Sequence, residues 1–196
     1  MPTEHPLLWI LAGPNGAGKT TYARRHFSDL VAARRFLNAD DVARRMSPAE
    51  PQRTAFAAAK AVLGRRADLI RRRTSFAIET TLASRTLLQA VQAAKRAGLT
   101  VTLTYLFVSN PALWNQRIAQ RVMLGGHHIP SDVVIKRYRR SLELLPAFLE
   151  VVDSAELFSA DAEPQLILRK RGQDVLVHDR SLWEAIRSLG QESSQA

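Results

Sequence analysis

The chain of 196 residues contains no cysteine, which excludes disulfide bridges and metal sites built from thiolates. It also lacks any apolar run of about 18 residues, so we expect no segment that crosses a membrane. The apolar stretch over residues 7–11 is too short for a signal peptide. These absences lead us to expect a cytoplasmic protein, because a cysteine-free chain is compatible with a reducing compartment.

Acidic residues are few compared with basic ones, and few of the basic residues are lysines. The chain has 28 lysines and arginines against 18 acidic residues, which gives a net charge of +10. Such a surplus favours anionic partners such as nucleotides, nucleic acid or acidic proteins, and arginine suits phosphate recognition. A solvated basic surface explains the charge equally well, so charge alone does not define a function. The length predicts one domain over residues 1–190, followed by a frayed tail over 191–196.

The most informative segment is a glycine-rich loop directly after the apolar run 7–11. Its sequence GPNGAGKT fits G-x-x-x-x-G-K-[ST], the phosphate-binding P-loop. In such a loop backbone N–H groups surround phosphate oxygens, Lys19 supplies a cation, and the Thr20 hydroxyl is placed to coordinate Mg²⁺. We therefore expect ATP or GTP with Mg²⁺ as cofactors, bound by Gly13, Pro14, Asn15, Gly16, Ala17, Gly18, Lys19, Thr20 and Thr21.

Strand patterns alternate with helical patterns along the chain. This alternation predicts an α/β P-loop NTPase or kinase fold, with a central, mostly parallel five-stranded sheet and helices on both faces. A hairpin over 164–178 and a short helix over 181–189 are expected at the C-terminus. Ligands bind such sheets at the carboxyl ends of the strands, which makes the residues after each strand the candidates for function. The five strands are predicted over residues 7–11, 35–38, 74–78, 100–108 and 155–159.

Two carboxylates follow predicted strands. Asp40 is suited to accept a proton from a substrate hydroxyl that attacks the γ-phosphate, and equally suited to cap the next helix. For Glu79 three roles stay open: a contact to a substrate hydroxyl or amide, a metal contact through water, or a structural ion pair with an arginine. Thr81 is expected on the same side of the extended chain as Glu79, so that both hold one ligand.

The most hydrophobic predicted strand, residues 100–108, is not followed by an aspartate. The usual Walker-B carboxylate of motor ATPases and GTPases is therefore missing at that place. Kinases of small molecules depend more on positioning and on cationic clamps, so the pattern favours a kinase.

Arginines that could form such a clamp lie further along the chain. Arg117 and Arg121 are four residues apart and share one face of a predicted helix. Together with arginines over 137–140 they flank the loop 125–128, as a lid that closes over phosphates requires. Arginine there neutralises charge on the transferring phosphoryl group. A solvated basic helix face is the alternative.

Together these segments resemble the zeta-toxin family of P-loop kinases, particularly its small, stand-alone bacterial members. The similarity spans about residues 7–145 and rests on GPNGAGKTT (13–21), NAD (38–40), FAIETT (76–81), and RV with GGH over 121–127 followed by IP and RY. The resemblance implies transfer of the γ-phosphate of ATP or GTP to the 3′-hydroxyl of UDP-N-acetylglucosamine.

The resemblance also implies a role for each candidate residue. Asp40 is the implied base and Thr20 the magnesium ligand, whereas Glu79 and Thr81 match an E-x-T element that contacts the amino sugar. The implied phosphate clamp consists of Lys19, Arg117 and Arg121.

The resemblance further implies a nucleotide-sugar substrate and, in toxin–antitoxin versions, a small antitoxin that blocks the nucleotide site. This chain departs from the family in its short C-terminal hairpin and helix, where many members carry longer lids and added elements. Two alternatives stay open: a kinase of another small-molecule or polynucleotide hydroxyl, with nucleic acid as a less favoured partner, and a non-catalytic nucleotide-binding module.

Overall fold

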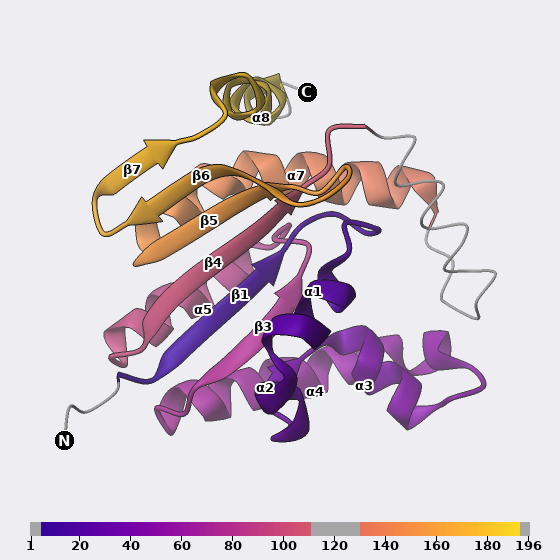
Figure 1. Cartoon of the computed structure of the whole chain (residues 1–196). Coiled ribbons are helices and arrows are strands. Elements are labelled where there is room, and N and C mark those ends of the chain that lie inside the picture. Colours follow the sequence, from indigo (N-terminus) through magenta and orange to yellow (C-terminus); the bar gives the residue numbers. More distant parts are fainter. Residues whose placement is uncertain (1–4, 111–129, 193–196) are drawn as a thin grey trace.

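The protein forms one seven-stranded sheet with helices on both faces, as a computed structural model that describes residues 5–110 and 130–192 shows (Figure 1). Five strands run parallel, and the last two add to one edge in antiparallel fashion. The spatial order is β2-β3-β1-β4-β5-β6-β7. The strands are β1 (Leu7–Ala12), β2 (Phe36–Leu37), β3 (Phe76–Thr80), β4 (Thr100–Phe107), β5 (Ser154–Ser159), β6 (Gln165–Arg171) and β7 (Asp174–Val177).

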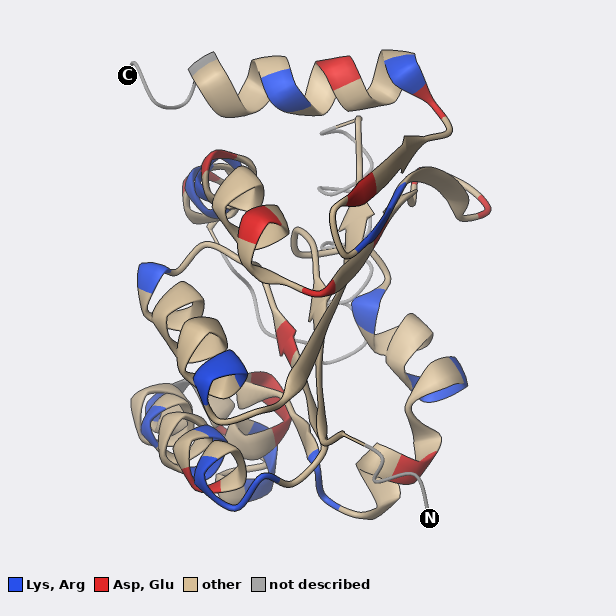
Figure 2. Cartoon of the chain, turned by 90° about the vertical axis from the view of Figure 1, so that its left-hand side faces the viewer, with Lys and Arg blue, Asp and Glu red and all other residues tan. Residues whose placement is uncertain are grey.

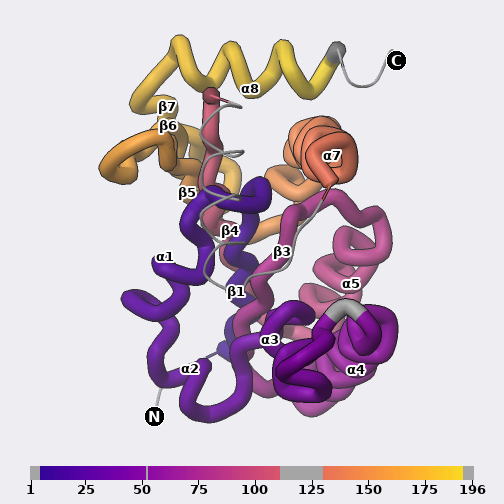
Figure 3. Tube along the Cα trace, turned by 90° about the vertical axis from the view of Figure 1, so that its right-hand side faces the viewer, coloured from indigo at the N-terminus to yellow at the C-terminus, as the bar shows by residue number. Residues whose placement is uncertain are grey.

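The helices form two layers around this sheet. Helices α4, α5 and α7 cover one face and α1 and α2 the other, while α8 packs against α7 and β6 (Figures 2 and 3). Within residues 5–110 and 130–192, no helix combines the length and apolarity needed to cross a bilayer. The helices are α1 (Lys19–His26), α2 (Ser28–Ala32), α3 (Ala39–Met46), α4 (Pro51–Arg71), α5 (Arg85–Arg96), α7 (Ser131–Val151) and α8 (Arg180–Glu192).

The core lies on both faces of the central strands. Residues such as Ile10 in β1 and Leu103 and Tyr105 in β4 are completely buried. Because helices cover both faces, these strands are apolar almost throughout instead of alternating with polar residues. The longest runs of apolar sequence therefore mark the strands at the centre of the sheet.

The predicted α/β fold is confirmed, and the predicted C-terminal hairpin belongs to the main sheet because β6 pairs with β5. Helix α7 continues through Pro146 to Val151. The lost backbone hydrogen bond is offset by burial of neighbouring residues on the same face, such as Leu145 and Phe148. Helix α8 includes Gln191 and Glu192 of the predicted frayed tail, whereas 193–196 lie outside the described residues.

Strand β1 lies between β3 and β4, and this arrangement positions the site. In the register of the sheet, Leu11 of β1 is level with Glu79 of β3 and with Thr104 of β4. The chain leaves β1 at Ala12 and enters the glycine-rich loop directly above these positions. The end of β3 is therefore adjacent to the loop, which the sequence alone does not reveal.

Candidate active site

The glycine-rich loop has the backbone shape that its sequence predicts. Gly13 has φ +143°, and a Cβ atom there would lie 2.5 Å from the carbonyl oxygen of Leu106, so no larger residue fits. Gly16 and Gly18 have φ near +80°, in the left-handed region where glycine is favoured. Helix α1 begins at Lys19, directly after Gly18, so the positive end of the helix dipole faces the loop.

The side chain of Lys19 lies inside this loop and is hydrogen-bonded to its backbone. Its side chain is 7% exposed, and Nζ donates hydrogen bonds of 2.8 Å to the carbonyl oxygens of Gly13 and Pro14. The Oδ1 atom of Asn15 is buried and accepts no hydrogen bond from the described residues. An ammonium group and an unsatisfied amide inside a nest of backbone N–H groups are the features expected of a site for phosphates.

Glu79, at the end of β3, connects the loop with the neighbouring strands. Its Oε2 atom accepts a 2.8 Å hydrogen bond from Nδ2 of Asn38 and lies 3.5 Å from the hydroxyl of Thr20. Burial raises the pKa of the Glu79 carboxyl above its ordinary value, and the nearby Asp40 and Asp41 raise it further. The charge of Lys19 and the hydrogen bond from Asn38 act in the opposite direction. The net result is a raised pKa, and the acidic groups gathered around Glu79 favour a cation at this place.

Asn38 organises both candidate carboxylates. Its Oδ1 atom accepts hydrogen bonds from the backbone N–H groups of Asp40 and Asp41, at 2.8 and 3.2 Å, and so caps helix α3. The alternative that Asp40 caps this helix is wrong, because Asn38 occupies that position. Asp40 lies in the first turn of α3 with an exposed side chain, which leaves its carboxylate accessible to a substrate. One amide thus fixes the start of α3 and, through its other end, Glu79.

Strand order explains why an acid after β4 is not needed. The chain places no aspartate after β4, as predicted, and Ser109 there binds the carboxylate of Asp161 instead. The carboxylate next to the loop comes from β3, on the other side of β1, where Glu79 lies beside Thr20. In P-loop NTPases the P-loop threonine and the Walker-B acid hold the same Mg²⁺, so a carboxylate beside Thr20 is a candidate for that role. The more hydrophobic strand β4 was the expected place of such an acid, whereas a metal contact of Glu79 was one of three roles left open for it.

The oxygen atoms at this edge suit a magnesium ion. Mg²⁺ prefers oxygen ligands and is held in nucleotide sites by one or two protein groups together with phosphates. Among residues 5–110 and 130–192 there is no group of three or more histidine, cysteine, aspartate or glutamate side chains that could hold a metal by itself. A hydroxyl from Thr20 beside the carboxylate of Glu79 fits the nucleotide-dependent arrangement instead.

A cavity of about 400 Å³ opens beside the loop, on the side away from Glu79. Two aromatic rings from α1 border it, Tyr22 and His26, which stack with centroids 4.2 Å apart. A partly apolar cavity that shares residues with the phosphate loop fits the base of a nucleotide. Sequence reasoning missed it, because its walls come from three distant segments: Ala17, Gly18, Thr21, Tyr22, Arg25, His26, Leu106, Phe158, Ala160, Ala162, Glu163 and Pro164.

Other predicted site residues have different outcomes. Thr81 follows β3, which ends at Thr80, and Leu82 next to it has φ +64°. The shared side of Thr81 and Glu79 therefore stays a prediction. Arg117 and Arg121, the predicted phosphate clamp, lie outside the described residues, as does the loop 125–128.

The fold and the loop together define a P-loop protein of the α/β class. A family model described as "AAA domain" (AAA_33) matches residues 8–145, and the chain belongs to this family. An uncharacterized protein of Haemophilus influenzae strain Rd is 30% identical over 138 residues, which are 67% of this chain and 96% of that protein.

Solved structures share the fold. A chain of the AvrRxo1-ORF1:AvrRxo1-ORF2 complex with ATP has a TM-score of 0.75 at 20% identity and covers 94% of this chain. This chain spans 64% of that longer protein. A structure of the PezAT chromosomal toxin–antitoxin system of Streptococcus pneumoniae has a TM-score of 0.65 at 15% identity and covers 100% of this chain and 88% of its own. The Pnkp1/Rnl/Hen1 RNA repair complex matches at 25% identity with a TM-score of 0.50, covering 71% of this chain and 45% of its own.

Proposed function

We propose that the protein is an ATP-dependent kinase that transfers the γ-phosphoryl group to a hydroxyl of a nucleotide sugar, namely the 3′-hydroxyl of UDP-N-acetylglucosamine. The observation that carries the proposal is the arrangement at the end of β3. There Glu79 contacts Thr20 of the phosphate loop and is joined through Asn38 to the helix turn that carries Asp40. A phosphate site and an accessible carboxylate beside it are what transfer to an alcohol requires.

In the proposed reaction Asp40 accepts the proton of the substrate hydroxyl. The hydroxyl oxygen forms a bond to the γ-phosphorus, the bond from that phosphorus to the β–γ bridging oxygen breaks, and ADP leaves. Lys19 moves from the carbonyl oxygens of the loop to the phosphates and neutralises negative charge. Thr20 and Glu79 are the residues that would hold Mg²⁺, directly and through water, and the ion supplies charge neutralisation on the phosphates.

ATP as the donor is supported by the loop and by the cavity beside it, which suits a nucleotide base. The AvrRxo1-ORF1:AvrRxo1-ORF2 structure with ATP supports the same donor by analogy of fold. The nucleotide-sugar acceptor and a small antitoxin partner rest on the resemblance to zeta toxins and on the shared fold of the PezAT toxin–antitoxin system. Arg117 and Arg121 remain the proposed clamp on the transferring phosphoryl group, and Thr81 a proposed substrate contact.

The test is a γ-phosphate transfer assay with Mg²⁺ and ATP over a panel of acceptors. The panel contains UDP-N-acetylglucosamine, other sugars and nucleotide sugars, and a 5′-hydroxyl RNA. The proposal predicts a phosphorylated product with UDP-N-acetylglucosamine, located on the 3′-hydroxyl by NMR. ATP binding without transfer to any acceptor would show a non-catalytic module instead.

Asp40→Asn tests the assigned base. Loss of a general base costs about 10²–10⁴-fold in rate, while nucleotide affinity is expected to stay near that of the parent protein. Asp41→Asn is the matched control, because it removes the same charge from the same helix turn but leaves Asp40 in place. Equal loss of affinity and rate in Asp40→Asn, or an equal rate loss in the control, would show that Asp40 is structural.

A polynucleotide hydroxyl is the second candidate acceptor. The net charge of +10 and the similarity to a chain of an RNA repair complex favour it. If this candidate holds, 5′-hydroxyl RNA is phosphorylated in the panel, and its binding weakens steeply with salt because counterions are released.

A further inference from the structure

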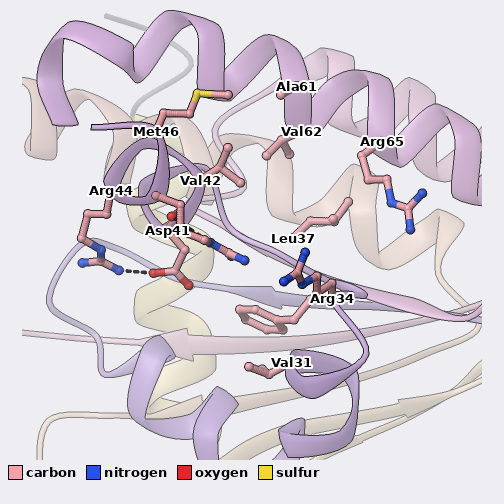
Figure 4. A pocket seen from close by; sticks show the side chains of 12 residues that line it. Val31, Arg34, Leu37, Asp41, Val42, Arg44, Met46, Ala61, Val62 and Arg65 are labelled. Carbon is pink, nitrogen blue, oxygen red and sulfur yellow. Dashed lines mark hydrogen bonds and ion pairs between the residues drawn. The ribbon is translucent and has the colours of Figure 1, made fainter. Parts of the chain in front are cut away.

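A second cavity, separate from the proposed active site, lies beside the edge strand β2 (Figure 4). It has a volume of about 650 Å³ and is bordered by the end of α2, by α3 and by α4. None of the phosphate-loop residues, nor Asp40 or Glu79, lines it. We call it the arginine groove, and its walls consist of Val31, Arg34, Phe36, Leu37, Asp41, Val42, Arg44, Arg45, Met46, Ala61, Val62 and Arg65.

The groove carries excess positive charge. Four arginines and one aspartate line it, and the aspartate, Asp41, is already paired with Arg44. Arg45 donates from Nε to the backbone carbonyl oxygen of Asp41 at 3.3 Å, which leaves the other donors of its guanidinium available. In the described part of the chain, the side chain of Arg34 makes no hydrogen bond or ion pair. The groove therefore holds guanidinium groups that lack carboxylate partners.

Arg65, on the α4 side, is also poorly neutralised. It lies 3.3 Å from the carboxylate of Asp68, but that one carboxylate is shared with Arg71 at 2.6 Å and Arg72 at 2.9 Å. The single carboxylate of Asp68 thus pairs with three arginines, and the longest of the three contacts is the one to Arg65, which lines the groove. Such a guanidinium is free to pair with an added anion.

The backbone at Arg34 has a helix-end conformation that usually holds glycine. Helix α2 ends in hydrogen bonds from the N–H of Arg35 to Leu30 and from the N–H of Arg34 to Val31, with Arg34 at φ +54°. This Schellman arrangement favours glycine at the left-handed position. Helix α5 ends in the same way and has Gly98 there, at φ +85°. An arginine at this position of α2 costs stability, and it places its guanidinium in the groove.

Apolar residues form the floor between the arginines. Phe36, Leu37 and Val62 are buried there, whereas Val31 and Met46 are about half exposed. Figure 4 shows Leu37, Val42 and Val62 among the side chains that line the groove. A cavity of this volume with an apolar floor and a few charged groups suits a small organic molecule. Arginine forks are well matched to phosphate oxygens.

We infer that the arginine groove is a binding site for a phosphate ester of nucleotide size, separate from the phosphate loop. Its phosphate pairs with Arg34, Arg45 and Arg65, and its organic part covers the apolar floor. Helix α3 forms one wall of the groove and also carries Asp40, so a ligand here contacts the same helix as the proposed acceptor site.

The test is a titration of the methyl-labelled protein with adenosine 5′-monophosphate, followed by NMR, while the phosphate loop is saturated with Mg²⁺ and a non-hydrolysable ATP analogue. Resonances of Val31 and Val62 report on the groove alone, and their response does not depend on transfer activity. The inference predicts saturable shifts, with a dissociation constant of about 1 mM or below. Absence of saturation up to about 10 mM would overturn it.

Matched variants connect the binding to the arginines. Arg34→Gly and Arg73→Gly remove the same charge at the same helix-end conformation, since Arg73 has φ +51° at the end of α4 but lies outside the groove. Arg65→Gln and Arg71→Gln form a second pair on the shared carboxylate. The Arg34 and Arg65 variants are expected to weaken binding by about tenfold, and the controls by less than about twofold. Equal losses in variants and controls would show only a general charge effect.

Two further probes identify the ligand class. Inorganic phosphate is expected to bind more weakly than adenosine monophosphate at the same resonances, because it cannot cover the apolar floor. Equal affinity of the two would contradict a site for an ester. An octanucleotide RNA that binds the groove more than about tenfold tighter than the mononucleotide would identify a nucleic-acid surface and overturn the inference.

Discussion

The side chain of Asn38 is expected to couple the stability of helix α3 to the carboxylate of Glu79. Its Oδ1 atom caps α3, and removal of such a cap costs about 1 kcal/mol. Its Nδ2 atom donates to a carboxylate, and such a hydrogen bond contributes about 1.5–3 kcal/mol. Asn38→Ala removes both, so we expect the free energy of unfolding to fall by about 2–4 kcal/mol. Urea denaturation followed by circular dichroism measures this change.

Two further variants separate the contributions of Asn38. Asn38→Asp keeps an oxygen that caps the helix but loses the donor and adds a second carboxylate next to Glu79. Because burial and nearby Asp40 already raise the pKa of Glu79, we expect this variant to recover stability at acid pH, where one carboxyl group is protonated. A double-mutant cycle of Asn38→Ala and Glu79→Gln is expected to give a coupling energy of about 1–2 kcal/mol between the two side chains. A loss below about 0.5 kcal/mol in Asn38→Ala, or zero coupling to Glu79, would refute the reasoning.

Two other predictions concern the loop and the opposite end of the sheet. Gly13→Ala places a Cβ atom 2.5 Å from the carbonyl oxygen of Leu106, at φ +143°. We expect this variant to lose at least about 2 kcal/mol of stability and to lose ATP binding, both measured by calorimetry. The control is Gly172→Ala, which also has a positive φ but places its Cβ atom in open space. Burial raises the pKa of Asp153, but hydrogen bonds from Lys95 and a backbone N–H outweigh this effect and hold the pKa below its ordinary value. The stability that ionised Asp153 contributes is present above the ordinary carboxyl pKa and is lost as the pH falls through the lower pKa of the folded state. Asp153→Asn therefore lowers the thermal midpoint at pH 7, and much less at a pH below both pKa values. An equal effect at both pH values would contradict this assignment.

The fold and the phosphate loop could be predicted because they depend on local signals. Apolar runs mark the buried parallel strands, and the glycine positions of the loop follow from left-handed backbone angles that larger residues avoid. Asp40 and Glu79 were identified by one rule, that ligands bind at the carboxyl ends of parallel strands. Their position at strand ends needed no knowledge of the strand order.

Features that depend on strand order or on several segments could not be predicted. The contact between Glu79 and Thr20 exists because β3 lies beside β1, and hydrophobicity had drawn attention to β4 instead. Asn38, and not Asp40, caps α3. Both side chains have an oxygen suited to a helix cap, so the sequence alone does not show which of the two is the cap. The arginine groove joins residues from α2, β2, α3 and α4, and nothing in the local sequence at Arg34 indicates that these elements converge there.

The most direct test of the central claim is a crystal structure with Mg²⁺ and a non-hydrolysable ATP analogue. We expect the triphosphate within the loop from Gly13 to Thr20, with Lys19 Nζ moved from the carbonyl oxygens of Gly13 and Pro14 to the phosphates. The γ-phosphate should lie beside the carboxylates of Asp40 and Glu79. A structure with the triphosphate outside the loop, or with Lys19 still bound to both carbonyl oxygens and Asp40 turned away from the γ-phosphate, would contradict the account.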